Sequence, residues 1–293
     1  MGLLDQVSTG RRRDPLRACV YGPPGVGKTG FSVASPRSIT IPVEDGANRI
    51  DVARLPRPKT WSDIRDAIRE LRVGKHEYKS LVIDTLDAAE ALCWAHVCRE
   101  GGKASIEAFG YGKGYIAAAD EWRVLLADLE ALQDAKGMNV ILVCHSIVRG
   151  FHNPTGDDYD RWTLRLHEKT AAALVKDWVE MLLFATHDDL AVKDDTGKRI
   201  GVSTGNRLLR TRHSAGYEAK SRLDVPDPIP LDWSAFQAEV DLAMADPKSL
   251  REQFESAAKE NLKAQAWVAS GGMARATETE LRAALRQLRK GGK

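Results

Sequence analysis

YGPPGVGKTG, residues 21–30, is the stretch that decides the fold of this chain. From Gly22 to Thr29 it matches the pattern G-x-x-x-x-G-K-[ST], directly after the apolar segment LRACVY (16–21). Between a strand and a helix, the backbone N–H groups of such a loop point inward, and the helix N-terminus adds positive potential. Together they hold a polyphosphate. The predicted phosphate loop consists of Gly22, Pro23, Pro24, Gly25, Val26, Gly27, Lys28, Thr29 and Gly30.

The side chains of this loop have separate expected tasks. Lys28 should reach the β- and γ-phosphates, and the Thr29 hydroxyl should ligate Mg²⁺. Asp84 ends the apolar run SLVID (80–84), where a carboxylate orients Mg²⁺ through water. An aspartate that only caps the next helix is the alternative for Asp84. We therefore expect ATP and Mg²⁺ as cofactors.

Strands and helices alternate along most of the chain. Apolar runs predict strands at 16–21, 38–43, 80–84, 139–145 and 179–187. Helices are expected near 28, from 60, after 84 and from about 114 to 135. The helix at 60 opens with Thr60 and Asp63 as a capping box. Its expected buried face comprises Trp61, Ile64, Ile68 and Leu71. This alternation indicates an α/β fold with a mostly parallel sheet covered on both faces.

The alternation of predicted strands and helices ends after Asp188. LAVKDDTGKRIGV (190–202) places an Asp-Thr-Gly turn between two short alternating stretches, which predicts an antiparallel β-hairpin. DVPDPIP (224–230) should end the sheet, because its prolines cannot donate ladder hydrogen bonds. The expected organisation is a basic N-terminal arm (1–15), a nucleotide-binding core (16–231) and a helical, basic C-terminal extension (232–293).

Composition excludes several classes. No run of about 18 apolar residues exists, so a membrane span is not expected, and the N-terminus lacks a secretory apolar region. We expect a cytoplasmic protein. The four cysteines show no C-x-x-C spacing, which favours reduced thiols. With a net charge of only +2, nucleic-acid binding would have to rest on local patches.

The sequence lacks a glutamate at the position where many ATPases carry the carboxylate that activates water. Ring ATPases of the AAA+ type usually carry a glutamate directly after the aspartate that Asp84 represents, whereas Thr85 follows here. Glu44, in TIPVEDGANRID (40–51), should lie at the carboxyl edge of the adjacent strand, where ligand-facing residues collect. Glu44 is the predicted general base, and Asp45 is the competing candidate.

These positions resemble the RecA-like core of recombinases and hexameric helicases. In that family a strand after the phosphate-loop helix ends in a catalytic glutamate, and VEDGANRID (43–51) is similar to it. The family also places a polar residue at the end of the fourth strand to sense the γ-phosphate. The resemblance assigns this role to His145, although a histidine that merely caps the strand would look the same.

The resemblance extends to YEAKSR (217–222). RecA-like assemblies reach into the neighbouring subunit's nucleotide with a paired basic element, here Lys220 and Arg222. Residues two apart on a strand point the same way, so both can meet one phosphate group. A solvated basic strand is the alternative. If Lys220 and Arg222 act as such a finger, the protein must self-assemble as a ring or filament.

Among RecA-like proteins, the layout of residues 16–231 is most similar to phage-encoded proteins that include the Sak-type single-strand annealing recombinases. The shared pattern includes VIDTLD, FGYGKGY, the strand ending in histidine, and EAKSR. The resemblance implies ATP-linked binding of single-stranded DNA and annealing or strand pairing inside a bacterial host cell. A single-strand DNA-binding protein is a further candidate partner.

Two segments are candidates for DNA contact. The segment 101–115 mixes aromatic and basic residues among glycines, the combination that non-specific single-strand binders use: Lys103, Phe109, Tyr111, Lys113 and Tyr115. The segment 145–162, expected to be a long polar loop, carries Arg149, Phe151, His152, Arg161 and Trp162. A lid or a subunit contact is the alternative for both. Three aspartates at 157, 158 and 160 count against a simple phosphate groove. The basic C-terminal helix and Arg11–Arg13 could bind DNA or serve in packing.

Other function classes share parts of this pattern. A helicase or helicase loader would use the same core, but it would unwind strands processively. A small-molecule kinase would show no DNA-stimulated turnover. A GTP switch is disfavoured because the chain has no N-K-x-D signature.

Overall fold

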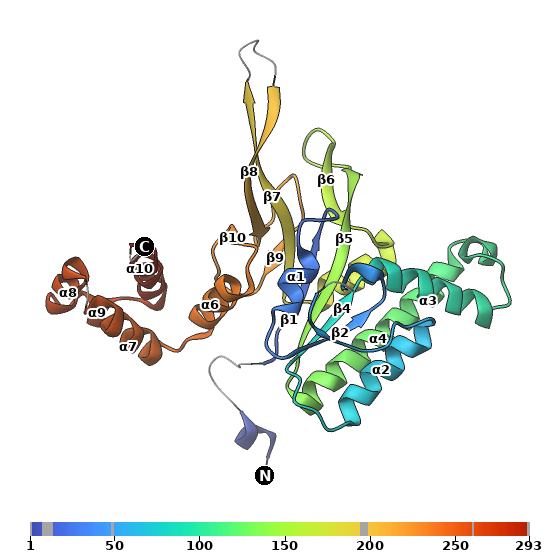
Figure 1. Cartoon of the computed structure of the whole chain (residues 1–293), viewed down its shortest axis with the longest axis horizontal. Coiled ribbons are helices and arrows are strands. Elements are labelled where there is room, and N and C mark those ends of the chain that lie inside the picture. Colours follow the sequence, from blue (N-terminus) through green and yellow to red (C-terminus); the bar gives the residue numbers. More distant parts are fainter. Residues whose placement is uncertain (1, 8–13, 48–49, 194–198, 260, 292–293) are drawn as a thin grey trace. The chain divides into compact units, whose positions relative to one another are not determined.

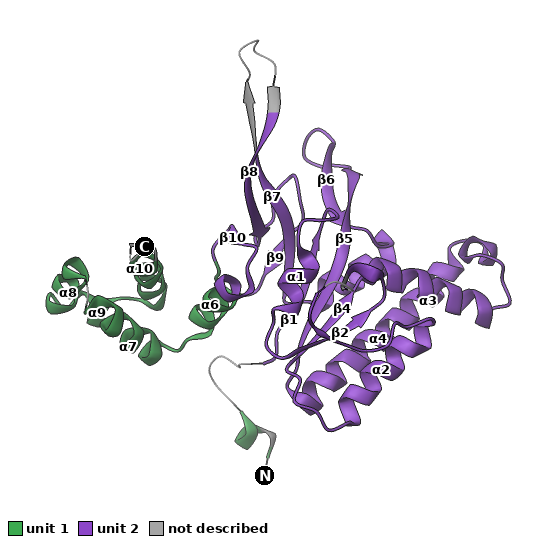
Figure 2. Ribbon diagram, viewed as in Figure 1, with its two compact units in different colours: residues 1–13, 223–225, 237–293 green, residues 14–222, 226–236 purple. Residues whose placement is uncertain are grey.

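The computed structural model describes residues 2–7, 14–47, 50–193, 199–259 and 261–291. The chain divides into two compact units, coloured separately in Figure 2. The core unit comprises Asp14–Arg222 and Pro226–Phe236. The helical unit comprises Met1–Arg13, Leu223–Val225 and Gln237–Lys293.

A ten-stranded, mostly parallel sheet forms the centre of the core unit (Figure 1). Its strands are β1 (Arg17–Gly22), β2 (Ser38–Pro42), β3 (Ala53–Arg54), β4 (Ser80–Asp84), β5 (Asn139–Phe151), β6 (Tyr159–Leu164), β7 (Met181–Lys193), β8 (Arg199–Arg210), β9 (Lys220–Ser221) and β10 (Ile229–Pro230). The order across the sheet is β10-β8-β7-β1-β5-β4-β2-β3, with β6 beside β5 and β9 beside β7. Because β1, β2, β4, β5 and β7 run parallel, their carboxyl ends meet at one edge.

Helices flank this sheet and make up the helical unit. They are α1 (Lys28–Val33), α2 (Trp61–Val73), α3 (Leu86–Glu100), α4 (Lys113–Lys136), α5 (Ala173–Trp178), α6 (Trp233–Met244), α7 (Pro247–Ala258), α8 (Leu262–Ala269), α9 (Gly272–Arg275) and α10 (Glu278–Gly291), with short turns η1 (Leu3–Gln6), η2 (Asp45–Ala47), η3 (Ile106–Phe109) and η4 (Glu168–Ala172). Among the residues that the structure describes, no helix is long and apolar enough to span a bilayer.

Helix α2 forms for the reasons that its sequence predicts. The Thr60 hydroxyl accepts a hydrogen bond from the Asp63 N–H (3.2 Å), and Asp63 accepts from the Thr60 N–H (2.9 Å), which completes the predicted capping box. Trp61 is fully buried and meets Trp122 of α4 edge to face, with ring centroids 5.3 Å apart. The predicted inner face of this helix is confirmed.

The two sides of the sheet are covered by different elements. Ile83 of β4 belongs to one large apolar cluster with residues of α2, α3 and α4. Phe31 of α1 instead packs against Trp233 and Phe236, with ring centroids 5.2 and 5.5 Å away. All five residues of β4 are buried, as expected for a central strand of a parallel sheet.

The prediction of a long polar loop at residues 145–162 is wrong. Strand β5 continues past the sheet to Phe151 and pairs antiparallel with β6, with Val148 opposite Trp162 and Phe151 opposite Tyr159. The isoleucine, valine and aromatic residues of both segments suit a pleated hairpin, which leaves only residues 152–158 as the connection.

The second hairpin agrees with prediction. Strands β7 and β8 pair antiparallel from Phe184–Arg210 to Lys193–Arg199, and Figure 1 shows them projecting beyond the other strands. The predicted Asp-Thr-Gly turn lies outside the described residues. The proline-rich segment contains the edge strand β10, where a proline is tolerated because one side of an edge strand has no partner.

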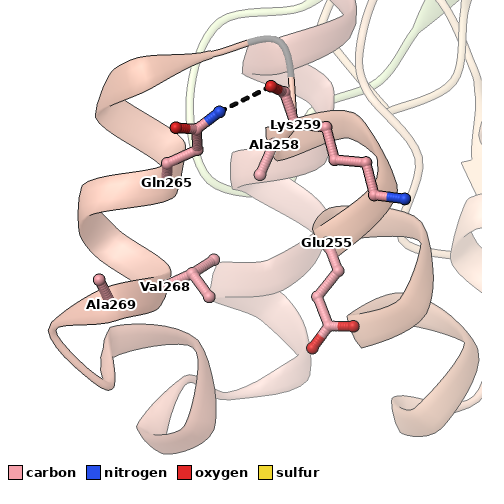
Figure 3. A pocket seen from close by; sticks show the side chains of 6 residues that line it. All are labelled: Glu255, Ala258, Lys259, Gln265, Val268 and Ala269. Atoms are coloured by element: carbon pink, nitrogen blue, oxygen red, sulfur yellow. Dashed lines mark hydrogen bonds between the residues drawn. The ribbon is translucent and has the colours of Figure 1, made fainter.

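The helical unit has a small core of its own. Leu281 and Leu285 of α10 are buried in one apolar cluster with Phe254 of α7. Thr277 and Glu280 form a capping box at the start of α10. A cavity of about 370 Å³ lies beside α7 and α8, where the Gln265 side chain donates to the carbonyl of Lys259 (Figure 3). The N-terminal arginines 11–13 lie outside the described residues.

Candidate nucleotide-binding site

The phosphate loop joins β1 to α1, as its sequence predicts. Gly25 and Gly27 have φ angles of +78° and +107°, a region that residues with a side chain rarely adopt. A Cβ at Gly22 would lie 2.2 Å from the carbonyl oxygen of Ala185 on the neighbouring strand. Glycine is therefore required at these positions, for backbone conformation at two of them and for close approach at the third.

Lys28 lies folded into its own loop. Its ammonium donates to the carbonyls of Gly22 and Pro23, both at 2.9 Å, and only 5% of the residue is exposed. Burial lowers the pKa of Lys28, although Asp84 opposes this shift. The cation is thus held where the phosphates would lie, on acceptors that phosphate oxygens can replace.

Thr29 and Asp84 are in direct contact. The Thr29 hydroxyl donates to one carboxylate oxygen of Asp84 at 2.7 Å. The other oxygen, Oδ1, is buried without a hydrogen-bond partner in the described part of the chain, and burial raises the pKa of Asp84. A hydroxyl beside an unsatisfied carboxylate fits Mg²⁺, which takes oxygen ligands and is often bound by few protein groups together with phosphates.

Glu44 lies beside this pair. The Val43 and Glu44 N–H groups both donate to the carbonyl of Asp84, at 2.7 and 3.2 Å, which ties the end of β2 to β4. A Cβ built at Gly46 would be 3.6 Å from Glu44 Oε1, 3.7 Å from Thr29 Oγ1 and 3.9 Å from Asp84 Oδ2. Three oxygens therefore converge on one small space at the sheet edge.

Asp45, the competing candidate for the base, is turned to other partners. Its carboxylate pairs with the Arg57 guanidinium at 2.8 Å, and 69% of its side chain is exposed. The geometry favours Glu44, whose side chain is 31% exposed.

His145 lies between two carboxylates. Its Nδ1 is 2.9 Å from Asp87 Oδ2, its backbone N–H donates to Asp87 Oδ1 at 3.0 Å, and its Nε2 is 3.8 Å from Glu44 Oε1. The hydrogen bond that His145 donates to Asp87 raises the pKa of His145. Burial alone would raise the pKa of Asp87, but the hydrogen bonds from His145 lower it below its usual value. Both shifts favour the imidazolium–carboxylate pair.

These three side chains also have the donor types of a metal site. One ligand atom from each of Glu44, Asp87 and His145 lies within 4.8 Å of the others. The ion pair already satisfies Asp87 and His145 without a metal.

Lys220 and Arg222 lie away from the phosphate loop of their own chain. Lys220 is opposite Leu182 near the start of β7, and its ammonium donates to the carbonyl of Lys176 at 2.7 Å. The Arg222 N–H donates to the carbonyl of Glu180 at 3.1 Å. Since Leu182 is paired with Cys19, Lys220 lies about 10 Å along the strands from Gly22, toward the opposite edge.

The predicted DNA contacts of segment 101–115 divide into two groups. Lys103, Tyr111 and Lys113 are exposed, Tyr111 completely. Phe109 is half-buried against Gly114, and Tyr115 stacks on His167 with ring centroids 4.1 Å apart. Only the first group presents free side chains to a ligand.

The predicted contacts of the β5–β6 hairpin have protein partners. Arg149 donates to the carbonyl of Leu166 at 2.8 Å and pairs with Glu168 at 3.3 Å. Arg161 pairs with Glu218 at 2.8 Å and lies 4.0 Å above the ring of Phe151. These arginines brace the hairpin.

Sequence reasoning missed two residues of the site. Arg207 of β8 reaches the phosphate loop, where its guanidinium donates to the carbonyl of Val26 at 3.4 Å. A Cβ at Gly27 would lie 2.4 Å from the same guanidinium. Asp87 had a weak signal, because it lies one helical turn after Asp84 at the start of α3. Arg207 had no signal in the sequence, since 180 residues separate it from Gly27.

Comparison with known proteins agrees with the site. Residues 14–223 match the family model described as "AAA domain". The chain belongs to this AAA domain family. The predicted α/β fold class is confirmed: a phosphate-loop core with a mostly parallel sheet flanked by helices, a late antiparallel hairpin and a helical C-terminal extension. AAA domains are ATPase domains that generally use ATP and Mg²⁺, and this one has Thr85 where a glutamate is common.

Structural comparison adds little to the AAA domain assignment. A structure titled "Crystal structure of the RadB recombinase" aligns with a TM-score of 0.39 and 14% identity, covering 76% of this chain and 90% of that one. No curated protein matches the sequence significantly.

Proposed function

We propose that this chain is a self-assembling ATPase that binds single-stranded DNA and promotes annealing or strand pairing in phage recombination or repair. In this proposal residues 16–231 form the ATPase core, and the protein acts in the cytoplasm of a bacterial host. The observation that supports the ATPase most is the convergence of Thr29, Asp84 and Glu44 on one space beside the phosphate loop.

Each residue of the site has a chemical task in hydrolysis. The loop N–H groups bind the phosphates, and Lys28 exchanges its two carbonyl acceptors for phosphate oxygens. Thr29 and Asp84 would hold Mg²⁺, which would neutralise phosphate charge. Glu44 accepts a proton from the attacking water as general base. Protonated His145 donates from Nε2 toward the γ-phosphate, because Asp87 already occupies Nδ1.

The position of the basic pair supports self-assembly in this proposal. Lys220 and Arg222 lie toward the edge opposite their own phosphate loop, so the proposed contact with a nucleotide requires a second copy of the chain. A finger supplied in trans raises hydrolysis by orders of magnitude.

The DNA part of the proposal rests on exposed side chains of the segment 101–115. Lys103 and Lys113 flank the fully exposed Tyr111, a combination that pairs phosphate contact with base stacking. A single-strand DNA-binding protein is a candidate partner. A helicase or helicase loader remains the second candidate function.

The deciding experiment measures ATP turnover with and without single-stranded DNA for the parent, Lys28→Ala and Arg222→Ala. We expect DNA to raise parent turnover and each variant to lose most of it. An equimolar mixture of the two variants should regain part, because one interface then combines an intact loop with an intact finger. A mixture that stays inactive contradicts the finger in trans. Processive unwinding of a duplex, without annealing, would favour the second candidate function, a helicase or helicase loader.

A further inference from the structure

A second cavity, of about 490 Å³, lies between the β5–β6 and β7–β8 hairpins. Its lining combines aromatic side chains with charged ones, and it includes Val148, Asp160, Arg161, Trp162, Phe184 and Tyr217. No residue of the phosphate loop lines it. The cavity is therefore separate from the nucleotide site, and its volume suits a small planar group.

Three aromatic rings form one wall. The ring of Phe184 stacks on Tyr217 with centroids 5.2 Å apart and an interplanar angle of 22°, and it stacks on Trp162 at 6.2 Å and 26°. Trp162 is 37% exposed, which is unusual for so large an apolar side chain, whereas Phe184 is buried. The stack thus ends in open ring surface where a further flat ring can be added.

The backbone fixes this wall in place. The Trp162 N–H donates to the carbonyl of Gly216 at 2.9 Å, and Ser214 and Tyr217 exchange two backbone hydrogen bonds. The Tyr21 hydroxyl donates to the carbonyl of Glu218 at 2.6 Å and accepts from its N–H at 3.1 Å. A wall held by backbone contacts needs little ordering when a ligand binds.

The charges around the cavity select against phosphate. Three carboxylates, Asp160, Asp188 and Asp189, line it with two guanidiniums, and Arg161 is already paired with Glu218. Arg210 lies 6.0 Å from the Tyr217 ring, and its Nε is buried without a hydrogen-bond partner among the described residues. Carboxylates accept hydrogen bonds from exocyclic amino groups, and an unpartnered Nε–H can donate to a ring nitrogen or carbonyl.

We propose that this cavity binds an unpaired nucleobase that carries an exocyclic amino group, stacked on Trp162, with its phosphates outside. The inference rests on the proposed function, because the base would belong to the bound single strand. A free nucleotide offers the same ring and is the other source to be tested.

The experiment uses the whole 293-residue chain, with Trp162 as the substituted residue. Binding of a fluorescently labelled oligo(dC) is compared for the parent, Trp162→Leu, Tyr217→Leu and the control Trp178→Phe, whose half-buried side chain lies under Arg17 at the other edge of the sheet. Leucine keeps apolar bulk but removes the flat face, and circular dichroism verifies folding. Binding of oligo(dT), of an abasic strand of equal length and of free dCMP is measured in the same way.

We expect Trp162→Leu to weaken oligo(dC) binding roughly 5- to 100-fold, as loss of one stacked base predicts. Tyr217→Leu should act in the same direction, and Trp178→Phe should have no effect. The parent should bind oligo(dC) more tightly than oligo(dT), and the abasic strand should be insensitive to Trp162→Leu.

The possible results separate this inference from the proposed function. If the parent binds oligo(dC) and Trp162→Leu binds equally well, the cavity proposal is overturned while DNA binding stands. If no strand binds, the proposed function fails; saturable dCMP binding that Trp162→Leu abolishes would then support a nucleobase cavity. No binding of either ligand overturns the cavity proposal as well.

Discussion

Asp87 accepts two hydrogen bonds from a single residue, His145: one from its backbone N–H at 3.0 Å and one from its ring Nδ1 at 2.9 Å. The first holds the end of the sheet strand against α3, and the second fixes the ring so that Nε2 faces Glu44. Because the hydrogen bond raises the pKa of His145, the same contact determines the geometry and the charge of this residue.

Replacing Asp87 with asparagine should move the pH dependence of ATP turnover. In the proposed mechanism the imidazolium is the active form, so turnover should fall as the pH rises through the raised pKa of His145. In Asp87→Asn that pKa drops, and the fall should begin at lower pH, with turnover at neutral pH roughly 10²-fold below the parent. Asp66→Asn, an exposed aspartate paired with Arg69, is the control. An unchanged pH profile would mean that His145 has no role as a charged donor.

Gly22→Ala should destabilise the core unit. The new methyl group would lie 2.2 Å from the Ala185 carbonyl oxygen, so β1 and β7 must separate locally. Overpacking of this kind costs about 1–3 kcal/mol in the free energy of unfolding, measured by denaturant titration. Gly30→Ala is the matched control, since no atom outside its own helix lies within 4 Å, and it should be neutral or gain up to about 1 kcal/mol. Equal stability of the two variants would contradict the close packing.

Glu90 should make the stability of the fold depend on pH. It is 6% exposed and accepts the His167 N–H on both oxygens, at 3.0 and 3.1 Å. Burial raises its pKa from 4.5 to about 7. The protonated form therefore stabilises the fold below pH 4.5, and this contribution is lost as the pH rises through about 7.

Glu90→Gln removes that titration. Relative to the variant, the parent should lose stability between pH 4.5 and 7, measured as the denaturant midpoint at pH 5 and pH 8. Glu100→Gln, an exposed residue on the same helix, should follow the parent. Parallel curves for parent and Glu90→Gln would show that Glu90 is ionised throughout.

Arg207→Ala should weaken nucleotide binding. The guanidinium lies against Val26 and Gly27 of the loop that we propose binds the phosphates. Loss of one charged hydrogen bond corresponds to roughly tenfold or more in the dissociation constant, measured by calorimetry. Arg69→Ala, an exposed arginine on α2, should bind nucleotide as the parent does. If both variants bind equally, Arg207 only braces the loop.

Local sequence patterns predicted much of the fold and of the candidate site, because each pattern involves residues that are close together in the sequence. The phosphate loop, the capping box at Thr60 and the buried strand ending at Asp84 depend on neighbouring residues. The β5–β6 hairpin was mistaken for a loop because its polar residues hid the strand pairing. The contact of Arg207 with Val26 depends on β8 returning beside β7, which only the sheet order reveals.

Tyr21 directly precedes the phosphate loop, yet its hydroxyl holds the chain at Glu218, next to Tyr217 of the cavity wall. One side chain thus joins the residue before the phosphate loop to the aromatic wall. If the proposed nucleotide displaces Gly22 on binding, this contact would carry the displacement to that wall. Occupancy of the two sites would then be mechanically linked inside a single subunit, before any neighbour takes part.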